Sequence, residues 1–141
     1  MSKVLSLRLK DQQVDRLSRS ARRMGRTLSE TAAVFLEESL RQSEFALIEF
    51  HDSPAGRQAY LKGSRLAIWQ IVDFSIVLQR DIEGTADRLE IAPAAVRAAL
   101  TYAATYPEEI NYAIQDNAKS EADLRQLIPN LETAIVDPTA S

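Results

Sequence analysis

The first residues of the chain alternate between apolar and polar side chains. Residues 3–9 read Lys-Val-Leu-Ser-Leu-Arg-Leu. This period of two residues is typical of a β-strand with one apolar face. Such a short strand has no pairing partner nearby in the sequence, and a second copy of itself is the simplest candidate. The pattern therefore predicts an antiparallel ribbon made by two chains, with three leucines on its buried face: Leu5, Leu7 and Leu9.

The spacing of apolar residues changes at Asp11 to that of a helix, which is expected to end at Met24. Gly25 suits the left-handed residue that follows the last turn of a helix. Thr27 is a favourable N-cap for a second helix, which should run to about Gln42. Its expected buried stripe comprises Leu28, Ala32, Ala33, Leu36 and Leu40. The first third, residues 1–44, is thus predicted as strand, helix, helix.

The remainder of the chain is predicted as a linker, a small helical domain and a tail. Pro54 and the following glycine place the linker at residues 45–55. Residues 56–115 should hold a small hairpin about Gly63 and then short helices that pack as a trihelical, helix-turn-helix-like domain. The helices are expected at Trp69–Leu78 and Thr85–Leu89, and after Pro93 and Pro107. Residues 116–141 form an acidic amphipathic tail. The expected fold class is mainly α.

Charge is distributed unevenly along the chain. Residues 1–26 carry eight basic and two acidic side chains, a net charge of +6, whereas residues 107–141 carry two basic and seven acidic ones, a net charge of −5. This asymmetry suggests an anionic partner for the front and a different partner for the rear. The alternative is that both are solvated surfaces.

Several classes of function are disfavoured by composition. The chain has no cysteine and one histidine, His51, so thiol chemistry, cysteine-bound zinc and a histidine-centred triad are not expected. No pair of carboxylates has a spacing that demands shared acid–base chemistry, and no glycine-rich phosphate loop is present. We expect no catalytic residue, metal or cofactor. Without an apolar run of ~20 residues we also expect no membrane partner, and a cytoplasmic protein.

The polar face of the N-terminal ribbon suits the major groove of DNA. The fork of Arg8 matches the O6 and N7 acceptors of guanine, and Ser6 can bond several bases. The helix start at Thr27 offers free N–H groups to a backbone phosphate. The candidate DNA contacts are Lys3, Val4, Ser6, Arg8, Lys10, Arg26, Thr27 and Ser29, and the candidate dimer contacts are Leu5, Leu7, Leu9 and Leu36. Alternatively, the strand pairs at an edge within its own chain and Arg8 is a solvated charge.

Residues Lys3 to Glu44 resemble the Arc/MetJ/CopG ribbon-helix-helix family. The resemblance lies in the alternating strand, in the Met24-Gly25 helix end and in the Thr27-Leu28-Ser29-Glu30 start, and it covers about a third of the chain. It implies an obligate homodimer that binds operator DNA with the residues at positions 4, 6 and 8. Val4 departs from the polar residue usual there, although it could touch a thymine methyl group.

The middle of the chain resembles a second family. Residues 56–69 are similar to the motif Gly-Arg-Pro-x-Ile-x-Gly-Thr-Arg-Ile-x-Val-Trp, with Gln58 in place of the proline, and residues 96–103 and 106–110 echo its later signature. This is a helix-turn-helix-like domain of formerly unknown function, found in VapB-type antitoxins beside PIN-like ribonuclease toxins. Lys62, Arg65 and Trp69 could add a second DNA surface or could be structural.

These resemblances imply the antitoxin of a type II toxin–antitoxin system, which represses its own operon and neutralises a PIN-like ribonuclease toxin. A toxin-binding stripe is expected in the tail, with Arg125 as the cation that enters a carboxylate-lined cleft: Leu124, Arg125, Leu127, Ile128 and Leu131. Alternatively, the stripe packs on its own middle domain. The rival functions are a freestanding regulator without a toxin and an architectural DNA protein.

Overall fold

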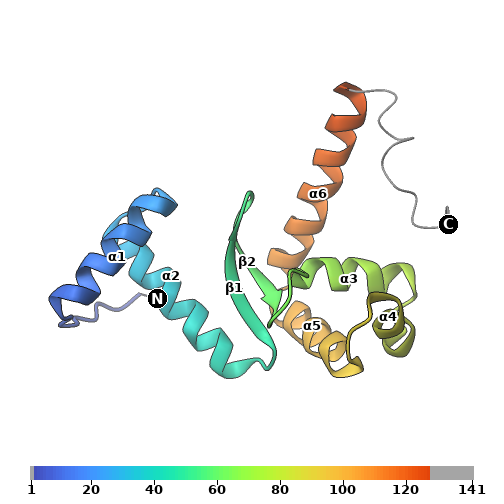
Figure 1. Ribbon diagram of the computed structural model, residues 1–141, viewed down its shortest axis with the longest axis horizontal. Helices are drawn as coiled ribbons and strands as arrows, with labels where there is room; N and C mark the ends of the chain where they lie inside the picture. The colour runs from blue at the N-terminus through green and yellow to red at the C-terminus, as the bar shows by residue number, and fades with distance from the viewer. Residues whose placement is uncertain (1, 128–141) are drawn as a thin grey trace. The chain divides into compact units, whose positions relative to one another are not determined.

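The computed structural model describes residues 2–127 of the 141-residue chain (Figure 1). This part is mainly helical, with six helices and one antiparallel hairpin of two strands. The chain divides into two compact units, one ending at Gln58 and the other beginning at Ala59. None of the helices within residues 2–127 combines the length and apolar character that a bilayer crossing requires.

The first unit begins with two helices, α1 (Asp11–Met24) and α2 (Leu28–Glu44), which pack against each other. Gly25 ends α1 in the left-handed conformation at φ 64°, as its position after Met24 predicts. Thr27 caps α2, because its Oγ1 accepts a hydrogen bond from the Glu30 N–H at 3.1 Å. The two helices and the cap between them are therefore confirmed, whereas most of the stripe predicted to be buried on α2 is exposed in a single chain: Leu28, Ala33, Leu36 and Leu40.

The N-terminal segment, residues 2–10, forms no strand in the single chain. Its side chains are exposed, with Leu5 at 74% and Leu7 at 67% of their full accessibility. The predicted strand-first order is therefore wrong for one chain, whose described elements run helix, helix, hairpin. The physical reason is that strand hydrogen bonds require a neighbouring strand, and none among the described residues pairs with this segment.

A β-hairpin occupies most of the stretch that was predicted as a linker. Its strands are β1 (Ile48–Ser53) and β2 (Gly56–Leu61). Pro54 and Gly56 mark the tight turn of this hairpin, and the break between the two compact units follows within β2. The Ser53 hydroxyl closes the turn by donating to the Gly56 carbonyl at 2.7 Å and accepting from the Ala55 N–H at 3.1 Å. The hairpin expected about Gly63 is reduced to an isolated bridge between Tyr60 and Ala67.

The second unit contains four helices: α3 (Ile68–Val77), α4 (Ile82–Leu89), α5 (Pro93–Thr105) and α6 (Pro107–Leu127). α3 and α5 each pack against the other three helices, so these two helices form the centre of this unit (Figure 1). Ile68, Ile71, Val96 and Tyr102 are fully buried and form the middle of the core. Proline opens α5 and α6 at the predicted residues, because its fixed φ suits the first helical turn.

The domain is not trihelical, and α6 runs without a break past Gln115 into the predicted tail. Nothing at that position stops a helix, since residues 108–127 contain neither glycine nor proline. The expected interruption at Pro129 lies outside the described residues. The structure thus joins residues 116–127 to the fourth helix of the second unit.

Candidate nucleic-acid interface

Polar and basic side chains of the N-terminal segment are all accessible to a large ligand. The exposed residues include the four that were predicted to meet DNA from this segment's polar positions: Lys3, Ser6, Arg8 and Lys10. Val4 is 98% exposed. The structure therefore leaves every predicted base-reading side chain accessible, but a single chain does not hold them in a defined register.

The start of α2 supplies the predicted phosphate site. Arg26, Thr27 and Ser29 are exposed beside one another. The first N–H groups of a helix have no partner within it and carry a partial positive charge, so they bind anions. The Thr27 hydroxyl satisfies the Glu30 N–H. The arrangement can accept a phosphate oxygen at this helix end, with the Arg26 guanidinium adding a charged donor.

Large apolar side chains of the first unit also remain uncovered in the single chain. Leu7 and Leu9 on the N-terminal segment, together with Leu36 and Leu40 on α2, are exposed. Exposed aliphatic side chains at this density mark an association surface more often than a solvated one. The four residues predicted for dimerisation, Leu5, Leu7, Leu9 and Leu36, are all among the exposed ones.

An ion-pair network that sequence analysis missed fixes the hairpin to α2. Arg57 on β2 donates to Glu38 on α2 through two bonds, Nε to Oε2 at 3.0 Å and NH2 to Oε1 at 2.6 Å. Its NH1 donates to Asp52 at 3.2 Å, and its guanidinium lies 5.4 Å from the centre of the Phe35 ring. The hydrogen bond that Arg57 donates to Glu38 raises the pKa of Arg57, against the opposing effect of burial, so Arg57 stays charged at every ordinary pH. The two partners lie nineteen residues apart, and no local pattern links them.

Replacing Arg57 with alanine should lower the free energy of unfolding of the first unit by about 1–3 kcal/mol, because Glu38 would keep a largely buried carboxylate without its paired donors. Chemical denaturation followed by circular dichroism measures the effect. Arg23→Ala is the matched control: its pair with Asp52, at 3.2 Å, joins side chains that are 59% and 47% exposed, so its loss should change stability by less than about 1 kcal/mol. Equal losses of stability in the two variants would contradict the conclusion that the pair of Arg57 with Glu38 fixes the hairpin to α2.

Only some of the residues predicted to bind a toxin lie within the part of the chain that the structure describes. Leu124, Arg125 and Leu127 lie in the last turn of α6 and are exposed, Leu127 to 79%. Ile128 and Leu131 lie outside the described residues. The uninterrupted helix places Leu124 and Leu127 one turn apart on the same side.

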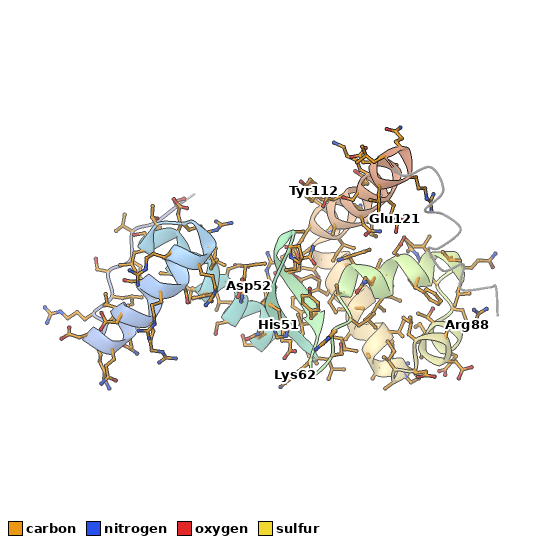
Figure 2. All side chains as sticks on the ribbon, turned by 45° about the horizontal axis from the view of Figure 1, so that its top comes forward. His51, Asp52, Lys62, Arg88, Tyr112 and Glu121 are labelled. Atoms are coloured by element: carbon orange, nitrogen blue, oxygen red, sulfur yellow. The ribbon has the colours of Figure 1, made fainter. Side chains whose placement is uncertain are left out.

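The predicted basic turn of the second unit is exposed at Lys62 and Arg65, whereas Trp69 is only half-buried at the start of α3. Figure 2 shows Lys62 at the turn beyond β2 and His51 and Asp52 on the hairpin. The Glu49 carboxylate lies 2.7 Å from the His51 Nε2.

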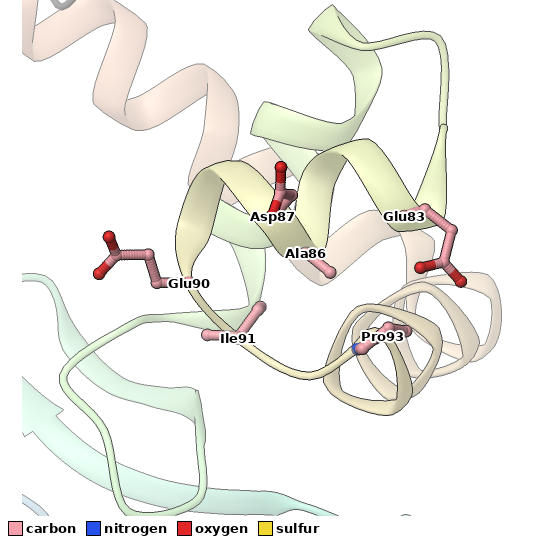
Figure 3. Close-up of a pocket in the computed structure, with 6 residues that line it drawn as sticks. All are labelled: Glu83, Ala86, Asp87, Glu90, Ile91 and Pro93. Carbon is pink, nitrogen blue, oxygen red and sulfur yellow. The ribbon is translucent and has the colours of Figure 1, made fainter.

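A small pocket of about 260 Å³ lies where α4 turns into α5 (Figure 3). Three carboxylates contribute to its lining, those of Glu83, Asp87 and Glu90. Like charges at this turn repel phosphate, so the turn between α4 and α5 is a poor surface for DNA. Within residues 2–127 no three acidic or histidine side chains are grouped closely enough to hold a metal ion.

Neither a protein family, nor a curated protein, nor a solved structure matched the chain.

Proposed function

We propose that this protein is a ribbon-helix-helix DNA-binding protein that acts as a homodimer. The observation that carries the proposal is the N-terminal segment, in which alternate leucines are exposed in a single chain without any pairing strand among the described residues. Pairing with the same segment of a second chain would satisfy the backbone hydrogen bonds and cover those leucines at once.

Such pairing places polar and basic side chains on the opposite face of the ribbon. Because successive side chains of a strand point to opposite faces, covering the leucines turns Ser6 and Arg8 of both chains outward. Two strands fit the major groove, where an arginine fork bonds guanine. The exposed start of α2, at Thr27, would then fix the ribbon on the backbone through phosphate contacts.

The narrower proposal is that the protein is an antitoxin, which represses its own operon and neutralises a PIN-like ribonuclease. It is supported by the resemblance of the middle of the chain to VapB-type antitoxins and by the exposed end of α6. There Leu124 and Leu127 offer an apolar contact beside the cation of Arg125. A ribonuclease cleft lined with carboxylates would attract that cation. The alternative, a freestanding regulator, keeps the same DNA surface and has no toxin partner.

Arg8→Ala tests the DNA-binding proposal. The variant should stay dimeric and lose about 1–3 kcal/mol of binding to the DNA upstream of its own coding sequence, with relaxed preference at one base position. Titration against a set of single-base variants of that DNA measures both effects. Arg88→Ala removes an exposed charge on α4, outside the proposed ribbon, and should leave the base preference unchanged. If Arg8→Ala discriminates between bases as the parent does, the ribbon is not the reader.

Co-expression tests the antitoxin proposal. The product of the neighbouring gene should copurify with the full chain, and the chain should rescue growth of cells that express that product. A chain ending at Leu127 keeps all of α6, so we expect it to bind DNA as before and to rescue poorly, because Ile128 and Leu131 are removed. Undiminished rescue would assign toxin binding to residues before Ile128 and exclude Ile128 and Leu131 from it. Failure to copurify any neighbour would favour the freestanding regulator.

A further inference from the structure

The outward face of α1 is made of arginines. Arg16, Arg19 and Arg23, here called the arginine stripe, follow one another at spacings of three and four residues. They lie on the side of the helix opposite the buried Ala21, which faces α2. At 1.5 Å per residue, the stripe extends over roughly 10 Å of the helix axis.

Little within the unit neutralises this stripe. All three arginines are exposed. Arg23 forms the solvent-exposed pair with Asp52, whereas Arg16 and Arg19 have no ion-pair partner within residues 2–127. The acidic residues of α1 are Asp11, in its first turn, and Asp15, one turn before Arg19. Like charges one turn apart destabilise a helix, and an anionic ligand would relieve that repulsion.

We propose that the arginine stripe binds phosphates of duplex DNA outside the bases that the N-terminal segment reads; this rests on the proposed function. The stripe faces away from α2, so it forms a surface separate from the one at Thr27. Arginine forks match phosphate oxygens, and duplex DNA presents about one charge per 1.7 Å. The stripe contains no apolar or aromatic side chain, and Gln12 continues it by one turn. A protein partner would require an apolar centre to its interface, so a phosphate backbone fits this face better.

The double variant Arg16→Gln/Arg19→Gln tests the proposal with a mixed-sequence duplex of about 40 base pairs, titrated between about 50 and 200 mM salt. A dimer would lose four guanidinium groups, and each phosphate contact contributes about 0.9 to the slope of log affinity against log salt. We expect the magnitude of that slope to fall by about 2–4, with binding at least about 10-fold weaker at the lowest salt. Glutamine favours helix, so circular dichroism should show an unchanged fold.

Arg88→Gln/Arg97→Gln is the matched control, because it removes the same charge from exposed positions of the second unit. It should leave the slope within about 1 of the parent. Equal slopes for the stripe variant and the parent would overturn the proposal, as would equal losses in both double variants. So would a stripe variant that changes only copurification or self-association, which would assign the stripe to a protein. Arg8→Ala tests base reading separately. If Arg8 proves to read bases while the stripe variant keeps the slope of the parent, the arginine stripe is refuted and the proposed function stands.

Discussion

Leu7→Asp should convert the dimer into monomers and abolish DNA binding. Leu7 is the central leucine of the N-terminal segment and is 67% exposed in a single chain, so aspartate is tolerated there until two chains pair. In the paired ribbon its carboxylate would be buried without a partner, at a cost of several kcal/mol per chain. Sedimentation equilibrium at micromolar concentration should give the mass of one chain, and titration with operator DNA should show no complex.

Val77→Asp is the control for this result. Val77 ends α3 in the second unit, is 75% exposed and takes no part in the proposed ribbon. The control should remain dimeric and bind DNA as the parent does. A dimeric Leu7→Asp protein would show that the leucine face does not join the chains.

Tyr102→Ala should unfold the second unit at or near room temperature while the first unit keeps its fold. Tyr102 is fully buried on α5, packs with its ring centre 5.0 Å from that of Tyr106, and donates to the Glu109 carboxylate at 2.6 Å. Truncation removes the aromatic ring and leaves a cavity, for which comparable core changes cost about 3–5 kcal/mol. Thermal unfolding by calorimetry should lose or strongly lower one transition, with DNA binding by the first unit retained.

Two controls separate the contributions of the ring and the hydroxyl. Tyr102→Phe keeps the ring and should cost about 0.5–1.5 kcal/mol, for the hydrogen bond to Glu109. Tyr112→Ala makes the same truncation on α6 at a position that is 71% exposed, and should change stability by no more than about 0.5 kcal/mol. A mild effect of Tyr102→Ala would mean that α5 and α6 are held together elsewhere.

The helices could be predicted because their ends depend on local chemistry. Gly25, Thr27, Pro93 and Pro107 each act through their own backbone preference, within one turn of the boundary that they set. The start of the expected tail at residue 116 rested on a change in composition, and acidic residues alone do not stop a helix, so α6 continues to Leu127.

The hairpin and its anchor could not be predicted in the same way. Pro54 and Gly56 are as common in a tight turn as in a linker, and only pairing between β1 and β2 distinguishes the two. The bond from Arg57 to Glu38 joins residues that the sequence pattern does not relate. The proposed N-terminal strand would depend on a contact further away still, since its proposed partner lies in another molecule. For the candidate site, the sequence therefore supplies the chemistry of Arg8 and Thr27, whereas their register depends on assembly.

Because of the exposed leucines of the N-terminal segment, the lifetime of the protein in the cell should depend on its concentration. A lone chain presents an apolar segment without regular secondary structure, and such terminal segments are favoured by proteases. The fraction of lone chains rises as the concentration falls, because pairing depends on mass action. A drop in synthesis would then accelerate degradation of the chains that remain. The proposed repression would therefore end abruptly instead of fading in proportion to supply.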